Sequence, residues 1–131
     1  MGFCLFNSIA IAACYAQQEF GLERVAVVDF DVHHGNGTQA AFWDEPSLLY
    51  ASTHQMPLYP GTGAASERGA NGQNIVNVQT EDFAWITRQL LTVAQECCEG
   101  RLASILEGGY DLQALGESAA AHVSELMSPA G

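Results

Sequence analysis

Basic residues are scarce in this 131-residue chain, which has 4 Lys and Arg together against 15 Asp and Glu. The formal net charge is therefore −11 at pH 7. Proteins that bind nucleic acid meet the phosphates with clustered Lys and Arg, so we expect no nucleic-acid partner here. The same charge favours a cationic small molecule or a basic peptide as the ligand.

The chain also lacks cysteine pairs with the spacing of metal ligands. Its cysteines, Cys4, Cys14, Cys97 and Cys98, form no Cys-x-x-Cys, so we interpret them as reduced packing residues. No apolar run is long enough to span a membrane, and no charged segment precedes the apolar N-terminus. We therefore expect a cytoplasmic protein. The hydrophobic fraction of 48% and mean hydropathy of +0.05 indicate a folded globule.

No repeat, low-complexity segment or linker interrupts the sequence, so residues 1–131 are predicted to form a single domain. Apolar runs predict four strands: Val25–Asp29, Leu48–Ser52, Asn74–Val78 and Leu102–Leu106. Helical periodicity and capping residues predict helices over Ile9–Phe20 and Thr38–Trp43, from Thr80 to before Gly100, and after Asp111. This alternation predicts an α/β fold with a mostly parallel sheet and helices on its faces.

The stretch Val25–Gly37 carries the strongest chemical signal. A β-branched run that suits a strand buried on both faces changes abruptly to Asp29, Asp31, His33 and His34, and then to a Gly-Asn-Gly turn. Asp31 and His33 are two residues apart, so their side chains leave the same face of an extended segment. One oxygen and one nitrogen donor converging there would suit Zn²⁺ or a similar divalent ion.

Polar residues follow three of the predicted strands. Asp31 and His33 follow the first, Ser52–His54 the second and Glu107–Tyr110 the fourth. The carboxyl ends of parallel strands share one edge, so these loops are expected to form a single pocket. The long segment Thr53–Gly72 is interpreted as a functional loop. Within it Glu67 and Arg68 are expected to be a solvated pair, and His122 is expected to face solvent from the last helix.

Five motifs together resemble the histone deacetylase superfamily, including its bacterial deacetylase-like and acetylpolyamine amidohydrolase branches. They are Gly2-Phe3-Cys4, Asp29-Phe30-Asp31-Val32-His33-His34-Gly35-Asn36-Gly37-Thr38-Gln39, Ser52-Thr53-His54, Tyr59-Pro60-Gly61-Thr62-Gly63 and Glu107-Gly108-Gly109-Tyr110-Asp111-Leu112. They span most of the chain in family order. The resemblance implies a truncated form of the three-layer arginase/deacetylase-like α/β fold, with helices on both faces of the sheet.

The resemblance also implies a zinc amidohydrolase with specific residue roles. Asp31 and His33 match two zinc ligands, and Tyr110 matches the catalytic tyrosine that polarises the acetyl carbonyl and then binds the oxyanion. The remaining matched residues surround these: Phe3, Gly108 and Gly109 at the substrate channel, Asp29 and Ser52 at a structural K⁺ or Na⁺, and His34 and Asn36 behind the ligands.

Two parts of the family pattern are missing from this sequence. The family carries a His-His pair upstream of Gly2, and a segment with the third zinc ligand between Val78 and Glu81. The resemblance implies a zinc-dependent deacetylase that hydrolyses an acetyl amide on a lysine-like or polyamine substrate, and this activity requires the missing groups to be supplied from elsewhere. The alternatives are a non-catalytic remnant with weak metal binding and a homo-oligomerising interaction module.

Overall fold

The computed structural model describes residues 4–78, 83–106 and 111–128. The chain divides into two compact units, Met1–Glu81 and Asp82–Gly131. That all 131 residues act as one domain stays a prediction.

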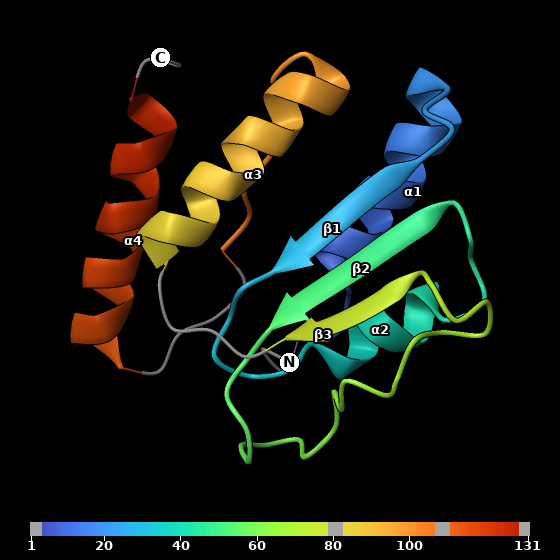
Figure 1. Ribbon diagram of the computed structural model, residues 1–131, viewed down its shortest axis with the longest axis horizontal. Coiled ribbons are helices and arrows are strands. Elements are labelled where there is room, and N and C mark those ends of the chain that lie inside the picture. The colour runs from blue at the N-terminus through green and yellow to red at the C-terminus, as the bar shows by residue number, and fades with distance from the viewer. Residues whose placement is uncertain (1–3, 79–82, 107–110, 129–131) are drawn as a thin grey trace. The chain divides into compact units, whose positions relative to one another are not determined.

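The first unit is built on a three-stranded parallel sheet in the order β1-β2-β3 (Figure 1). Its strands are β1 (Val25–Asp29), β2 (Leu48–Thr53) and β3 (Ile75–Val78). The register pairs Asp29 with Ser52 at the carboxyl end of the first two strands. The parallel sheet confirms the prediction made from the alternating pattern. Its three strands match the first three predicted strands, with bounds that differ by at most one residue.

Helices α1 (Ser8–Phe20) and α2 (Asn36–Phe42) pack against the same face of this sheet (Figure 1). Asn7 caps α1 by accepting a hydrogen bond from the backbone of Ala10, and Gly21 ends it with a left-handed φ of 64°. The buried core between helices and sheet consists of Ala10, Ala13, Val27, Phe42, Leu48, Tyr50 and Ile75. Helix α2 follows directly on the polar turn after β1, so its packing fixes where that turn lies.

The expectation that the first strand is buried on both faces is wrong. Alternate residues of the sheet point away from α1 and α2, and there Ala26 is exposed, Leu49 is 38% exposed and Val76 is 42% exposed. The two helices cover only the face that carries Val27 and Tyr50, because strand side chains alternate between faces.

The second unit pairs helices α3 (Phe83–Cys98) and α4 (Leu112–Met127), which pack against each other. Asp111 caps α4 by accepting from the backbone of Gln113 and Ala114, as predicted. Gly100 follows α3 with a φ of 75°. The predicted start of α3 at Thr80 lies outside the described residues.

The predicted strand Leu102–Leu106 is not formed. Residues 101–106 are described and adopt no strand or helix. An apolar run becomes a strand only when a neighbouring strand accepts its backbone hydrogen bonds, and Leu106 is instead 70% exposed. The residues are apolar, as a strand requires, but the prediction that they form a strand is wrong.

Candidate functional site

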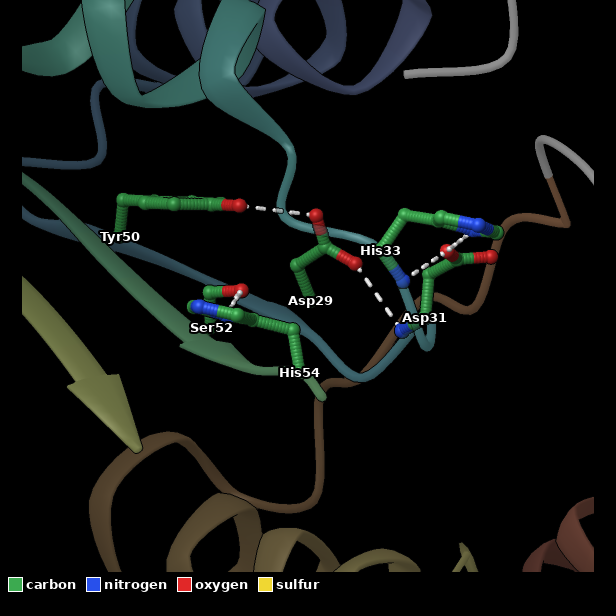
Figure 2. A network of polar contacts seen from close by, with 6 residues as sticks. All are labelled: Asp29, Asp31, His33, Tyr50, Ser52 and His54. Atoms are coloured by element: carbon green, nitrogen blue, oxygen red, sulfur yellow. Dashed lines mark hydrogen bonds and ion pairs between the residues drawn. The ribbon is translucent and has the colours of Figure 1, made fainter. Parts of the chain in front are cut away.

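The turn after β1 is folded by its own carboxylates (Figure 2). Asp29 accepts a hydrogen bond from the backbone N–H of Asp31 at 3.1 Å, and Asp31 accepts one from the backbone N–H of His33 at 2.7 Å. Each aspartate thus binds the backbone two residues ahead, which is how Asp shapes turns. The Asp-x-Asp-x-His spacing therefore determines its own local geometry.

This turn brings Asp31 and His33 together. Oδ1 of Asp31 lies 3.2 Å from Nδ1 of His33, and the two side chains are 40% and 29% exposed. Donors bound to one tetrahedral Zn²⁺ at about 2.0–2.2 Å are about 3.3–3.5 Å apart, so this pair fits two adjacent zinc positions. Among the described residues no third His, Cys, Asp or Glu joins the pair.

Asp29 is held in place from the neighbouring strand. The hydroxyl of Tyr50 donates to Oδ2 of Asp29 at 2.8 Å, and Tyr50 is fully buried (Figure 2). Burial is the largest cause that raises the pKa of Tyr50, and the negative charge of Asp29 raises it further. The phenol therefore stays protonated and donates its hydrogen. Sequence reasoning missed Tyr50, although its place two residues before Ser52 on the inward face of β2 was a usable signal.

Ser52 is oriented by His54. Nε2 of His54 lies 3.1 Å from the carbonyl oxygen of Gly63, which can only accept, so this nitrogen carries the hydrogen. In the neutral ring Nδ1 then accepts the hydroxyl hydrogen of Ser52 at 2.9 Å. The lone pairs of Ser52 remain for another partner, and Asp29 sits opposite in the strand register. Such oxygen donors suit a hard cation.

A second network fixes the loop between β2 and β3, and the sequence did not reveal it. His34 is 1% exposed and contacts Thr62 through Nδ1 at 2.8 Å and Gln39 through Nε2 at 2.9 Å. Burial lowers the pKa of His34 despite the hydrogen bond to Gln39. Asn77 of β3 also donates to Gln39. His34 thus links the loop to α2, and its predicted place behind zinc ligands stays a prediction.

Glu67 closes this network, so the expectation of a solvated Glu67–Arg68 pair is wrong. The Glu67 carboxylate accepts hydrogen bonds from the Gln39 side chain and from the backbone N–H groups of Gly63 and Ala64. Burial raises the pKa of Glu67, but the hydrogen bonds from Gln39, Ala64 and Gly63 together outweigh it and leave the pKa below its ordinary value. The loop is therefore tied to α2 through one carboxylate.

We expect this carboxylate to make the fold acid-sensitive. Its folded pKa lies below 4.5, so its contribution is complete above pH 4.5 and is lost as the pH falls through the folded pKa. The half-exposed position limits the loss to about 1 kcal/mol. Urea unfolding at about pH 6 and about pH 3.5 should show this extra loss in the wild type and in Glu23→Gln, an exposed-carboxyl control, but not in Glu67→Gln. Equal acid losses in all three proteins would contradict the assignment.

The other predicted site residues are distributed as follows. Asn36 is the first residue of α2, directly after the turn, and its backbone donates to the carbonyl of His34 at 3.0 Å. Phe3, Gly108, Gly109 and Tyr110 lie outside the described residues. His122 does not simply face solvent, because both its ring nitrogens contact hydroxyls within the second unit.

Comparison with known proteins identifies relatives of this chain. Residues 1–80 and 72–126 match the family model of the histone deacetylase domain. Histone deacetylase 10, chloroplastic, of Oryza sativa subsp. japonica is 35% identical over 172 residues, covering 92% of this chain and 39% of that protein. Histone deacetylase 14, chloroplastic, of Arabidopsis thaliana is 33% identical over 172 residues, covering 92% and 41%. The crystal structure of the HDA15 HD domain matches with a TM-score of 0.79 and 33% identity, covering 98% of this chain and 52% of that chain.

These matches confirm the α/β deacetylase-like fold. The chain spans about two fifths of the length of the two plant relatives. Their aligned stretch of 172 residues exceeds the 131 residues here, so they contain residues that this chain lacks. The two family matches meet over residues 72–80, where β3 ends. None of the described helices is long and apolar enough to cross a membrane. The chain belongs to the histone deacetylase family.

Proposed function

We propose that this chain is the metal-binding part of a zinc-dependent deacetylase that hydrolyses an acetyl amide on a lysine-like or polyamine cation. The observation that carries the proposal is the 3.2 Å approach of Asp31 Oδ1 to His33 Nδ1 on a turn that both residues help to fold. The net charge of −11 supports a cationic substrate.

The residues of this chain would divide the work as follows. Asp31 and His33 would hold zinc, which when bound acidifies a water molecule and polarises the acetyl carbonyl. Asp29, held by Tyr50, keeps the turn in place by accepting from the backbone of Asp31. By the family match Tyr110 would donate its hydroxyl hydrogen to the acetyl oxygen.

We further propose that Asp29 and Ser52 hold a structural K⁺ or Na⁺. They are register partners on adjacent strands, and His54 leaves the hydroxyl oxygen of Ser52 able to accept or coordinate. A bound cation beside Asp29 would stiffen the base of the zinc turn. The family match and the oxygen-donor chemistry support this assignment.

Metal analysis of the purified chain tests the zinc proposal. We expect one zinc per chain. Asp31→Asn or His33→Ala should weaken zinc binding by about 100-fold or more, because losing a ligand should cost more than losing a residue that only hydrogen-bonds a ligand. Asp44→Asn makes the same change at an exposed aspartate and should bind as the wild type does. A chain that takes up no zinc, or binds it equally without His33, would refute the proposal.

An acetyl-lysine fluorogenic substrate tests the activity. The described residues supply two donors, whereas a catalytic zinc site has three, so the remaining ligand and the base must come from beyond them. Turnover that is abolished by Tyr110→Phe would support the enzyme. Stoichiometric zinc without turnover would instead support the non-catalytic alternative.

Exposed apolar side chains on the face of the sheet away from α1 and α2 favour a second candidate, a homo-oligomerising module. Leu49 and Val76 are 38% and 42% exposed on that face, which is unusual for the middle of a strand. Light scattering on the wild type and on Leu49→Ser decides this point. A wild-type mass of two chains that falls to one in the variant supports the module, and a mass of one chain in both excludes it.

We propose a reducing compartment, such as the cytoplasm, as the site of action. Within the described residues Cys14, Cys97 and Cys98 form no disulfide, as is usual where thiols are kept reduced. The two plant relatives carry the word chloroplastic in their names. Cell fractionation with an antibody to the chain distinguishes the compartments.

A further inference from the structure

The second unit contains a serine–histidine–threonine arrangement that the zinc proposal does not use. Oγ of Ser104 lies 2.7 Å from Nε2 of His122 on α4, and Nδ1 of His122 lies 2.7 Å from Oγ1 of Thr87 on α3. All three residues belong to the unit Asp82–Gly131. A histidine between a serine and a second oxygen is the arrangement of an activated nucleophile.

The hydrogen bond that Thr87 makes to Phe83 determines which nitrogen of His122 carries a hydrogen. Thr87 donates its hydroxyl hydrogen to the carbonyl oxygen of Phe83 at 2.6 Å, so its oxygen is left to accept. Nδ1 of His122 therefore carries a hydrogen and donates it to Thr87. In the neutral ring the lone pair then lies on Nε2, and Nε2 accepts the hydroxyl hydrogen of Ser104.

The surroundings keep this arrangement fixed and uncharged. Thr87 is fully buried, so the orienting oxygen cannot move away. Burial also lowers the pKa of His122 below its ordinary value of 6.5, which leaves the ring neutral at pH 7. The same two helices also carry Arg88, Glu96, Glu117 and Glu125, of which Arg88 and Glu125 pair with each other at 2.6 Å.

We infer that Ser104 is a nucleophile activated by His122, and that it accepts acyl groups from activated carboxylic esters. Ser104 itself is exposed and therefore accessible to a reagent. Its own segment also exposes Leu102, Ile105 and Leu106, which favours esters with an apolar acyl chain. General-base assistance contributes about 10²–10⁴-fold, enough to distinguish Ser104 from an ordinary surface serine.

The reaction balances without an added oxidant or metal. Oγ of Ser104 attacks the ester carbonyl carbon while its hydrogen passes to Nε2 of His122. The bond to the leaving alcohol breaks, and the alcohol oxygen takes that hydrogen from Nε2. Water then attacks the acyl-serine with His122 as base, releasing the carboxylic acid and returning the hydrogen to Ser104.

Labelling of the full chain with an alkyl fluorophosphonate tests the inference, with modified serines located by peptide mass spectrometry. Ser124, exposed on α4, serves as the internal reference. Ser104 should label at least about tenfold faster than Ser124. His122→Gln keeps hydrogen-bonding capacity but cannot take the proton, so it should reduce labelling of Ser104 to the rate of Ser124. Thr87→Ser should retain the fast rate and Thr87→Val should lose it.

A purely structural contact would give a different result. Equal labelling of Ser104 and Ser124, or a folded His122→Gln protein that labels as the wild type does, overturns the inference. If His122→Gln does not fold by circular dichroism, the wild-type pH profile decides. The ratio of Ser104 to Ser124 labelling should rise in one step between about pH 5 and 8, as His122 loses its proton. The midpoint of that step should lie below 6.5, and a flat ratio overturns the inference.

Discussion

Gly63→Ala is expected to lower the free energy of unfolding of the first unit by about 2–5 kcal/mol. Gly63 has a φ of 92°, a conformation that costs an L-residue about 1–2 kcal/mol. A Cβ there would also lie 2.5 Å from Nε2 of His54 and 2.7 Å from Cδ2 of His34. Both rings are buried and hydrogen-bonded, so overpacking should add about 1–3 kcal/mol.

Gly61→Ala is the matched control for that substitution. Gly61 has a φ of 76° and no atom within 4 Å of an added Cβ, so only the backbone cost of about 1–2 kcal/mol should appear. Urea unfolding followed by Trp43 in a Trp85→Phe background reports on the first unit, since the chain has two tryptophans. Equal losses for the two alanine variants would show that the histidine rings do not confine Gly63.

Gly35→Ala is expected to cost about 2–4 kcal/mol and to weaken zinc binding as well. An added Cβ would overlap Oδ2 of Asp29 and lie 2.6 Å from the hydroxyl oxygen of Tyr50. Tyr50 is fully buried and cannot retreat, so Asp29 must turn away and leave the phenol without its acceptor. The backbone of Asp31 then also loses its hydrogen bond to Asp29, and the turn that holds the proposed zinc ligands Asp31 and His33 loosens.

Gly37→Ala provides a control with the opposite sign. Gly37 lies in α2 with nothing within 4 Å of an added Cβ, so alanine there should stabilise the chain by about 0.5–1 kcal/mol. Zinc titration and urea unfolding of both variants measure the two effects together. Should Gly35→Ala behave like Gly37→Ala, the contact between Gly35 and the Asp29–Tyr50 pair would be wrong.

Local rules were sufficient for the ends of helices and for the turn that carries Asp31 and His33. Asn7, Gly21 and Asp111 cap their helices, and a cap involves only the residues next to it. The Asp31–His33 pair was also predicted, since the contacts that fold its turn join residues two positions apart. Such features depend on covalent neighbours and need no knowledge of the rest of the chain.

The errors arose where a residue depends on a distant partner. Leu102–Leu106 has the composition of a strand, but none of the strands formed by the described residues pairs with it. Glu67 was expected in solvent, and it is instead bound by Gln39, 28 residues away in the sequence. Tyr50 and Asp29 are 21 residues apart, and Thr87 and His122 are 35 apart. Periodicity carries no information about such pairs.

The amino-acid order alone determined the family motifs, the helix caps and the carboxylate–imidazole pair, because each is encoded within a few consecutive residues. Only the folded chain decided that Glu67 ties the loop to α2, that Tyr50 secures Asp29, and that Ser104 meets His122. The physical reason is that these hydrogen bonds join segments far apart in the sequence, which burial of apolar side chains within each unit brings together.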